Sequence, residues 1–374
     1  MPRWWRRSDQ SSKENVVNRI VRIGVDLAKN VMQLHGVDIA EHVVIRRAVT
    51  REKFLEWFAN LAPCVVAMEA CTASHFWARR LREYGHDVRL IPPQFVVPYR
   101  KGGSSVKNDA VDAEAICEAA SRPHMRYVPV KTPAQQGALV LHRMRQGLIE
   151  ERTALVNRLR GLVAEFGIFL PQGIHRFRER FAEAVEDGGN ELPGLTRVAL
   201  LRGWTRIVEL DAEIDWFDKQ VAQHAKNDPD ARRVTEMFGV GLITASAASA
   251  TVGDARQFRN GRQFASWLGL VPKQNSSGGK ERLGRITKQG DAYLRTLLFQ
   301  CARVTLTAAR RRQDRLARWV TQLVERVGYG KALIAIANKH ARVLWAILAK
   351  GQRFDPSYDG QPTGLQHNEG PIAS

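Results

Sequence analysis

Short runs of Val, Ile and Leu, separated by polar positions, fill the first quarter of the chain. The runs at 20–27, 31–37 and 42–49 follow one another after brief polar breaks, and this spacing predicts three strands in an antiparallel meander. Two more apolar runs, at 64–68 and 87–91, have the length of buried strands. These runs predict a sheet that begins as a meander and continues beyond it.

Helical periodicity separates the later strands and follows them. Apolar residues recur at helical spacing at 51–61 and 74–84, and a further helix is predicted at 109–120. Strands joined through helices add to a sheet by crossovers, so we expect a mixed sheet covered by helices. The order βββαβαβ followed by a helix is the plan of ribonuclease H-like α/β domains.

Two long helices are predicted in the middle of the chain, at 135–169 and 193–226. Leu and Met recur every three, four or seven residues in the first, and apolar residues recur every three or four in the second. Such stripes are typical of helices packed along their length as in a coiled coil. They fit an intrachain hairpin, which is the commoner arrangement, or a seam between two copies of the chain.

A pair of glycines lies near the start of a third region, which begins at about residue 228. Gly239 and Gly241 separate a helical pattern from a helix of small residues, which is the arrangement of a helix-hairpin-helix. Glycines there let backbone amides approach a phosphate, although an ordinary tight turn has the same pattern. The predicted organisation is a basic tail at 1–18, an α/β domain at 19–130, a coiled-coil region at 131–227, a mostly helical domain at 228–350 and a polar tail at 351–374.

The chain is strongly basic. Its 374 residues include 57 Lys and Arg against 38 Asp and Glu, a formal charge of +19, and 44% of residues are hydrophobic, so the chain can fold. This charge attracts polyanions, which makes nucleic acid the leading partner and an anionic membrane surface the second. The four cysteines form no CxxC pair, and no apolar stretch reaches the ~20 residues of a membrane span, so a reducing cytoplasm is expected.

Four carboxylates, here called the acidic tetrad, fall where predicted strands end and where a helix begins. Asp26 closes the first strand and Glu69 the fourth, and these strands are neighbours in a mixed sheet of this order. Asp109 and Asp112 are spaced to share one helix face. Converging carboxylates repel one another unless a hard divalent cation such as Mg²⁺ or Mn²⁺ lies between them, and two such ions promote phosphoryl transfer. Taken singly, Asp109 also fits a helix cap and Asp112 a solvated surface position.

The motifs around these carboxylates resemble a known family. Ile23-Gly-Val-Asp26-Leu-Ala-Lys, Met68-Glu69-Ala and Lys107-Asn-Asp109-Ala-Val-Asp112-Ala are similar to the DEDD transposases of bacterial insertion sequences, whose first domain is like that of the RuvC Holliday-junction resolvase. The segments 264–280 and 284–295 resemble that family's C-terminal transposase domain. The resemblance covers about residues 20–350, in two domains that follow in the family's order.

The resemblance implies a recombinase guided by a structured RNA from the element's own end, which pairs with donor and target DNA. The acidic tetrad would hold metal, and Ser277 would attack the phosphodiester to form a covalent intermediate with DNA. Ser276 is adjacent, so the position of the nucleophile stays open between the two. A serine needs a base or a metal to become nucleophilic, and a metal from the tetrad would make the active site composite.

Basic residues crowd the segment around Ser277. They are candidates for phosphate contacts, although a run of charges is more often a solvated face. The expected partners are double-stranded DNA, a structured guide RNA and further copies of the chain, at the nucleoid of a bacterial cytoplasm and away from any membrane. Two alternatives remain: a metal-dependent, structure-specific nuclease in which Ser277 is only structural, and a non-enzymatic nucleic-acid packaging protein. Besides the two hairpin glycines, the predicted nucleic-acid contacts are Lys273, Lys280, Arg282, Arg285, Lys288 and Arg295.

Overall fold

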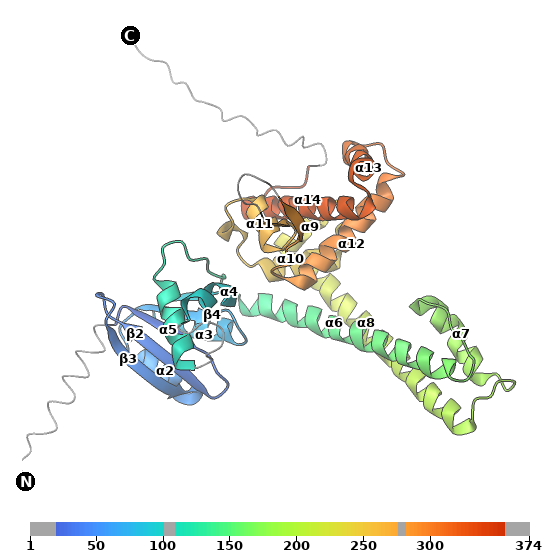
Figure 1. Ribbon diagram of the computed structural model, residues 1–374, viewed down its shortest axis with the longest axis horizontal. Helices are drawn as coiled ribbons and strands as arrows, with labels where there is room; N and C mark the ends of the chain where they lie inside the picture. The colour runs from blue at the N-terminus through green and yellow to red at the C-terminus, as the bar shows by residue number, and fades with distance from the viewer. Residues whose placement is uncertain (1–19, 101–108, 276–281, 356–374) are drawn as a thin grey trace, which may run out of the picture. The chain divides into compact units, whose positions relative to one another are not determined.

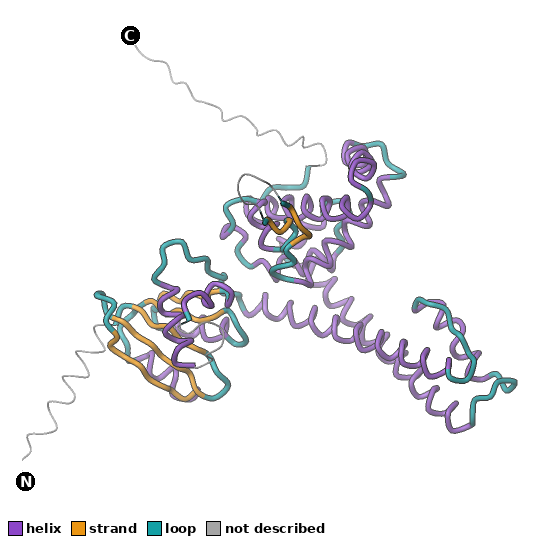
Figure 2. Tube along the Cα trace, viewed as in Figure 1, coloured by secondary structure: helices purple, strands orange, loops and turns teal. Residues whose placement is uncertain are grey.

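The computed structural model describes residues 20–100, 109–275 and 282–355. The chain divides into two compact units, residues 1–132 and 133–374. The main sheet belongs to the first unit, whereas the described part of the second is built almost wholly from helices (Figure 2). The predicted α/β domain followed by a helical region is therefore confirmed in this coarse form, and the finer division of the helical region stays a prediction.

The first unit is built on a mixed sheet with the predicted order of elements. β1, β2 and β3 form the antiparallel meander, β4 pairs in parallel with β1, and β5 pairs in parallel with β4. The neighbouring positions of β1 and β4 are those expected from the order of elements. The strands are β1 (Arg22–Asp26), β2 (Val31–Val37), β3 (Val43–Thr50), β4 (Val65–Glu69) and β5 (Asp87–Ile91), arranged as β3-β2-β1-β4-β5.

Helices cover both faces of this sheet (Figure 1). Successive residues of a strand point to opposite faces. Val25 and Met68 accordingly pack with Phe54 and other residues of α2 and α3, whereas Ala67 packs with Ile116 of α5 on the opposite face. The helices are α2 (Arg51–Ala59), α3 (Ser74–Glu83), α4 (Pro93–Val96), the 3-10 helix η2 (Val97–Tyr99) and α5 (Asp109–Ala120).

The second unit begins with a helical hairpin. α6 (Pro133–Ala164) and α8 (Gly194–Asn227) pack along each other, and α7 (Ile174–Glu186) lies between them in sequence. An ion pair between Arg152 and Asp211, 2.6 Å apart, joins the two long helices. The apolar stripe of α6 is therefore buried at least in part inside this hairpin, as Leu148 shows. Met144 and Leu162 of the same stripe are 50% and 49% exposed, and pairing of two copies stays a prediction.

The remaining helices share one hydrophobic core, and the short strands β6 and β7 lie outside it. α10 consists largely of Ala, Ser and Thr and is almost wholly buried, because its small side chains let the surrounding helices come close. Asp228, Asn260, Asp291 and Asp314 each accept a backbone N–H bond at the start of a helix. The elements are α9 (Pro229–Thr235), α10 (Leu242–Val252), η4 (Ala255–Gln257), α11 (Gly261–Trp267), β6 (Pro272–Gln274), β7 (Leu283–Ile286), α12 (Ala292–Ala309), α13 (Arg315–Val327) and α14 (Tyr329–Lys350).

Helix α14 is long and apolar enough to cross a membrane by length and composition alone. Its Ile336, His340 and Leu344 are buried, and the two apolar ones belong to the core of the second unit. Lys339 and Arg342 lie in the middle of the helix, where a membrane span would have to bury them. The structure therefore uses α14 as a core helix.

Candidate active site

The acidic tetrad begins at the ends of two neighbouring strands. β1 and β4 run parallel with Val25 opposite Met68, so the next residues, Asp26 and Glu69, leave the same edge of the sheet. Both residues are partly buried. Each follows an apolar run that anchors its strand in the core, and each is therefore held at a fixed point on this edge.

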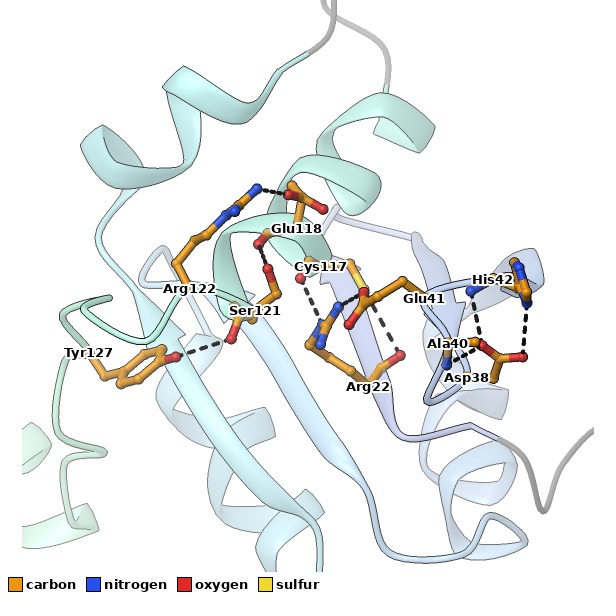
Figure 3. A network of polar contacts seen from close by, with 11 residues as sticks. Arg22, Asp38, Ala40, Glu41, His42, Cys117, Glu118, Ser121, Arg122 and Tyr127 are labelled. Carbon is orange, nitrogen blue, oxygen red and sulfur yellow. Dashed lines mark hydrogen bonds and ion pairs between the residues drawn. The ribbon is translucent and has the colours of Figure 1, made fainter.

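The lack of a side chain at Gly24 brings helix α5 onto β1. A Cβ at Gly24 would lie 2.1 Å from the carbonyl oxygen of Ala113 and 2.4 Å from the amide nitrogen of Cys117, so any side chain would push strand and helix apart. Arg22 adds to this contact: its Nε donates to the Cys117 carbonyl oxygen at 2.9 Å, and its guanidinium pairs with Glu41 (Figure 3). These contacts place the first turn of α5 beside the end of β1.

Asp109 and Asp112 occupy that first turn. Asp109 is exposed, whereas Asp112 is only 5% exposed. Arg100, which lies between β5 and α5 in sequence, joins Asp112 to Glu69: its Nε is 2.7 Å from Asp112 Oδ1 and its Nη2 is 3.3 Å from Glu69 Oε1. The carboxylates from β4 and α5 thus share one guanidinium.

The pKa of Asp26 shows that the other three carboxylates act on it. Burial and, after it, the charges of Asp109, Asp112 and Glu69 raise the pKa of Asp26 to about 6, against the opposing effect of Arg100. Burial also raises the pKa of Glu69, while Arg100 holds it down. The other three predicted carboxylates therefore lie within electrostatic reach of Asp26, and their role in holding a metal ion stays a prediction.

The donor set fits a divalent cation. Carboxylate oxygens are the ligands that Mg²⁺ and Mn²⁺ prefer. Asp112 Oδ1 is buried and makes no well-aligned hydrogen bond, since its contact with Arg100 is short but poorly directed. Over the described ranges, however, no three His, Cys, Asp or Glu side chains are close enough to hold a metal ion together. Binding a cation therefore requires the carboxylates to draw together.

The predicted nucleophile falls between two short strands. Ser277, its alternative Ser276 and the predicted contact Lys280 lie outside the described residues. The flanking strands β6 and β7 pair antiparallel, and the Asn275 amide donates to the Arg282 carbonyl oxygen at 3.0 Å. This bond joins the two residues on either side of segment 276–281, so both ends of the segment are fixed to one hairpin.

Two glycines hold the base of this hairpin against helix α11. A Cβ at Gly290 would lie 2.0 Å from the Trp267 carbonyl oxygen, and one at Gly269 would lie 2.3 Å from the Gln289 amide nitrogen. Both glycines have positive φ, which other residues rarely adopt. Arg295 adds hydrogen bonds from Nη1 to the carbonyl oxygens of Leu268, at 3.0 Å, and Gln289, at 2.7 Å.

The predicted nucleic-acid contacts differ in their surroundings. Lys273, Arg282, Arg285 and Lys288 are exposed on or beside the hairpin. Arg295 is partly buried and supports the hairpin base as described above, which gives it a structural task. A contact of any of these residues with phosphate stays a prediction.

The two glycines between α9 and α10 differ, and a contact inside the core accounts for Gly239 alone. Gly239 has a φ of 81°, and a Cβ there would lie 2.4 Å from Thr305 Oγ1 of α12. Gly241 is exposed at the start of α10. The buried Cys301 thiol of α12 donates instead to Thr244 Oγ1 of α10 at 3.4 Å. The predicted approach of these amides to a phosphate stays a prediction.

Sequence reasoning missed two features. The first is Arg100. The sequence indicates its role only by its position between the two elements that carry Glu69 and Asp112. The second is a buried cluster in the second unit: His142 Nε2 and His224 Nδ1 each lie 2.9 Å from Ser246 Oγ, and His142 Nδ1 lies 3.1 Å from the Tyr293 hydroxyl. Burial lowers the pKa of His142 to about 4, so this imidazole is neutral where it joins α6 to α10 and α12.

Comparison with known proteins agrees with this architecture. Residues 23–168 match a DEDD-type family of IS110 described as "Transposase", and residues 231–317 match the "Transposase IS116/IS110/IS902 family". A "Probable family 20 transposase" of Pseudomonas aeruginosa is 48% identical, over 90% of this chain and 98% of its own length. The "Transposase for insertion sequence element IS1328" of Yersinia enterocolitica is 38% identical, over 90% of this chain and 98% of its own. The "Transposase for insertion sequence element IS1111A" of Coxiella burnetii is 39% identical, over 89% and 90%.

All these relatives are transposases, and such enzymes act on DNA by cleaving it and transferring its strands. The chain belongs to the IS110/IS116 family of insertion-sequence transposases. The DEDD type of its first unit indicates the use of a divalent metal ion.

Proposed function

We propose that this transposase cuts and exchanges DNA by two transesterifications through a serine, with a divalent cation held by the acidic tetrad. The observation that carries the proposal is the convergence of Asp26, Glu69, Asp109 and Asp112 on one edge of the mixed sheet, with Arg100 as their counter-charge. The strand order and the covering helices support the further proposal of a ribonuclease H-like, RuvC-like domain. Mg²⁺ or Mn²⁺ at the tetrad would act as a Lewis acid on a phosphodiester.

In the first step the Ser277 oxygen bonds to phosphorus and its proton passes to a base. The bond from phosphorus to the departing deoxyribose oxygen breaks, and that oxygen takes up the proton and becomes a free hydroxyl. In the second step a hydroxyl of the partner strand attacks the same phosphorus and releases Ser277 with its proton restored. One phosphodiester is exchanged for another, so no nucleotide hydrolysis is needed. The hairpin bond between Asn275 and Arg282 supports this assignment by fixing both ends of the segment that carries the serine.

Mapping a covalent protein–DNA adduct tests the serine. We expect Ser277→Ala to lose both cleavage and adduct, while the matched control Ser276→Ala keeps both. If Ser276→Ala is inactive and Ser277→Ala active, the nucleophile moves by one residue. Normal cleavage by Ser277→Ala with free DNA ends would refute the serine route and leave a metal-dependent nuclease, the reaction of resolvases. Glu69→Gln tests the third alternative, a non-enzymatic packaging protein, because the function of such a protein would not depend on the Glu69 carboxylate.

We further propose that a structured RNA from the element guides the choice of DNA and that copies of the chain meet on it in the bacterial cytoplasm, at the nucleoid. The formal charge of +19 supports binding of both nucleic acids, and the helix–turn–helix arrangement of α9 and α10 supports a helix-hairpin-helix contact. Removing the copurified RNA should impair the selection of DNA sites more than it weakens the overall affinity for DNA. Unchanged site selection after nuclease treatment of the RNA would contradict guidance, and a monomer on DNA in light scattering would contradict oligomerisation.

A further inference from the structure

A cleft in the second unit gathers cations without acidic partners. It has a volume of about 480 Å³ and lies between α13, α14 and the start of β6. Arg326, Lys331, Lys339 and Arg342 line it, and none of the other described residues of its wall is Asp or Glu. Among the residues that the structure describes, none of these four cations forms an ion pair. Elsewhere in this unit several arginines are paired with carboxylates, so the cleft concentrates charge that the fold leaves uncompensated.

The side chains between these cations are suited to a nucleic-acid backbone. Lys339 Nζ lies 4.9 Å from the centre of the Trp319 ring, which orients the ammonium group in the cleft. Burial lowers the pKa of Lys339, and the neighbouring charges of Arg342 and Arg315 lower it further. An anion in the cleft would relieve this repulsion. A lining of fixed cations beside apolar surface is the arrangement by which proteins hold phosphates and sugars.

The cleft adjoins the hairpin that carries the predicted nucleophile. Pro272, the first residue of β6, is part of the cleft wall, and Leu270 before it is another part. Asn338 of α14 donates from Nδ2 to the Leu270 carbonyl oxygen at 3.1 Å, which ties the cationic helix to the chain leading into β6. A ligand in the cleft is therefore held at a set distance from the base of the hairpin.

We propose that this cleft binds the sugar-phosphate backbone of the DNA strand that is cut, beside the phosphodiester attacked from the β6–β7 hairpin. The choice of DNA over RNA rests on the proposed serine chemistry. The choice of a phosphodiester backbone rests on the charge of the cleft, the side chains that line it and its position beside the hairpin. Lys331, Lys339 and Arg342 are its phosphate-binding residues.

Lys339 has a matched control on the same helix. Lys350 also places its Nζ over a tryptophan, 5.5 Å from the centre of the Trp345 ring, but it does not line the cleft. Binding of the full-length protein to a fluorescein-labelled duplex from the element's end is measured by anisotropy in EDTA, where no cleavage occurs. We expect the double variant Lys339→Gln/Arg342→Gln to bind about tenfold more weakly and to lower the slope of log affinity against log salt by about 2, while Lys350→Gln changes either value little.

Lysine acylation followed by mass spectrometry localises the contact in the unmutated protein. The duplex should protect Lys331 and Lys339 from acylation and leave Lys350 reactive. Equal losses of affinity in the double variant and in Lys350→Gln, or no protection at Lys339, would overturn the proposal. Protection by the element's RNA without protection by duplex would overturn the assignment to DNA.

The same measurements separate this inference from the serine chemistry. If the duplex protects the cleft but Ser277→Ala still cleaves DNA, the serine route is refuted and the cleft stands as a DNA site. If the serine adduct forms while the cleft stays unprotected, the chemistry stands and the inference fails. The double variant is also compared with the parent in thermal unfolding, and an unchanged melting temperature assigns any loss of affinity to the lost charges.

Discussion

Replacing Asp26 with Asn should stabilise the metal-free protein while ending strand cleavage. The pKa of Asp26 rises from 3.8 to about 6 on folding, chiefly through burial and then through the other three carboxylates. Because the folded pKa is the higher one, the ionised carboxylate costs stability: the cost is absent below pH 3.8 and complete above about pH 6. The difference between these two pKa values corresponds to about 3 kcal/mol of stability. Solvent screening at this partly exposed side chain reduces the cost to about 1–2 kcal/mol.

Urea unfolding of the full chain, followed by hydrogen exchange in peptides from β1 and β4, measures this effect in the first unit alone. At about pH 7.5 we expect Asp26→Asn to unfold at higher urea than the parent, and at about pH 3.5 we expect the two to coincide. Glu56→Gln on the exposed face of α2 removes the same charge away from the tetrad and should shift stability by no more than about 0.5 kcal/mol.

A divalent cation should make the parent protein more stable than Asp26→Asn. A cation bound by the tetrad stabilises the parent in proportion to RT ln(1 + [L]/Kd), and the variant that lacks one ligand gains less. If Asp26→Asn is equally or less stable than the parent at about pH 7.5 without metal, the repulsion inferred from the structure is refuted. If Mg²⁺ and Mn²⁺ stabilise both proteins equally, the tetrad is not the metal site.

Three more predictions follow from single contacts. Gly24→Ala should lower the free energy of unfolding of the first unit by about 3 kcal/mol or more, measured in urea, whereas Gly147→Ala, with open space around it, should be stabilising. Arg100→Gln removes the charge that lowers the pKa of Asp26, so the pH–rate profile of cleavage should move to higher pH, and an unmoved profile would contradict the pairing. Burial lowers the pKa of His142 from 6.5 to about 4, so the folded protein keeps its full stability above pH 6.5. As the pH falls from 6.5 to 4, the free energy of unfolding should drop by up to about 3 kcal/mol, because the unfolded chain binds the proton more readily. His142→Gln should remove this acid sensitivity in urea titrations.

The order of elements in the first unit could be predicted because each signal is local. Strands such as β1 and β4 are continuous apolar runs, and the position of Asp26 and Glu69 then follows from the rule that parallel neighbours end at one edge. The β6–β7 hairpin was not predicted, because strands of three and four mostly exposed residues carry no alternating pattern. The contact of His142 with Ser246 joins residues 104 positions apart and leaves no trace in either helix pattern.

Arg100 has a consequence for how the tetrad responds to metal. In the structure its guanidinium already contacts both Glu69 and Asp112, so a cation that binds these carboxylates competes with an internal one. The measured affinity then reflects both pairings, and the apparent dissociation constant is the intrinsic one divided by the fraction of molecules in which Arg100 has left the carboxylates. The ion pair therefore moves metal binding to higher concentrations of free metal, and each carboxylate that receives the ion exchanges the protein's own cation for a bound one.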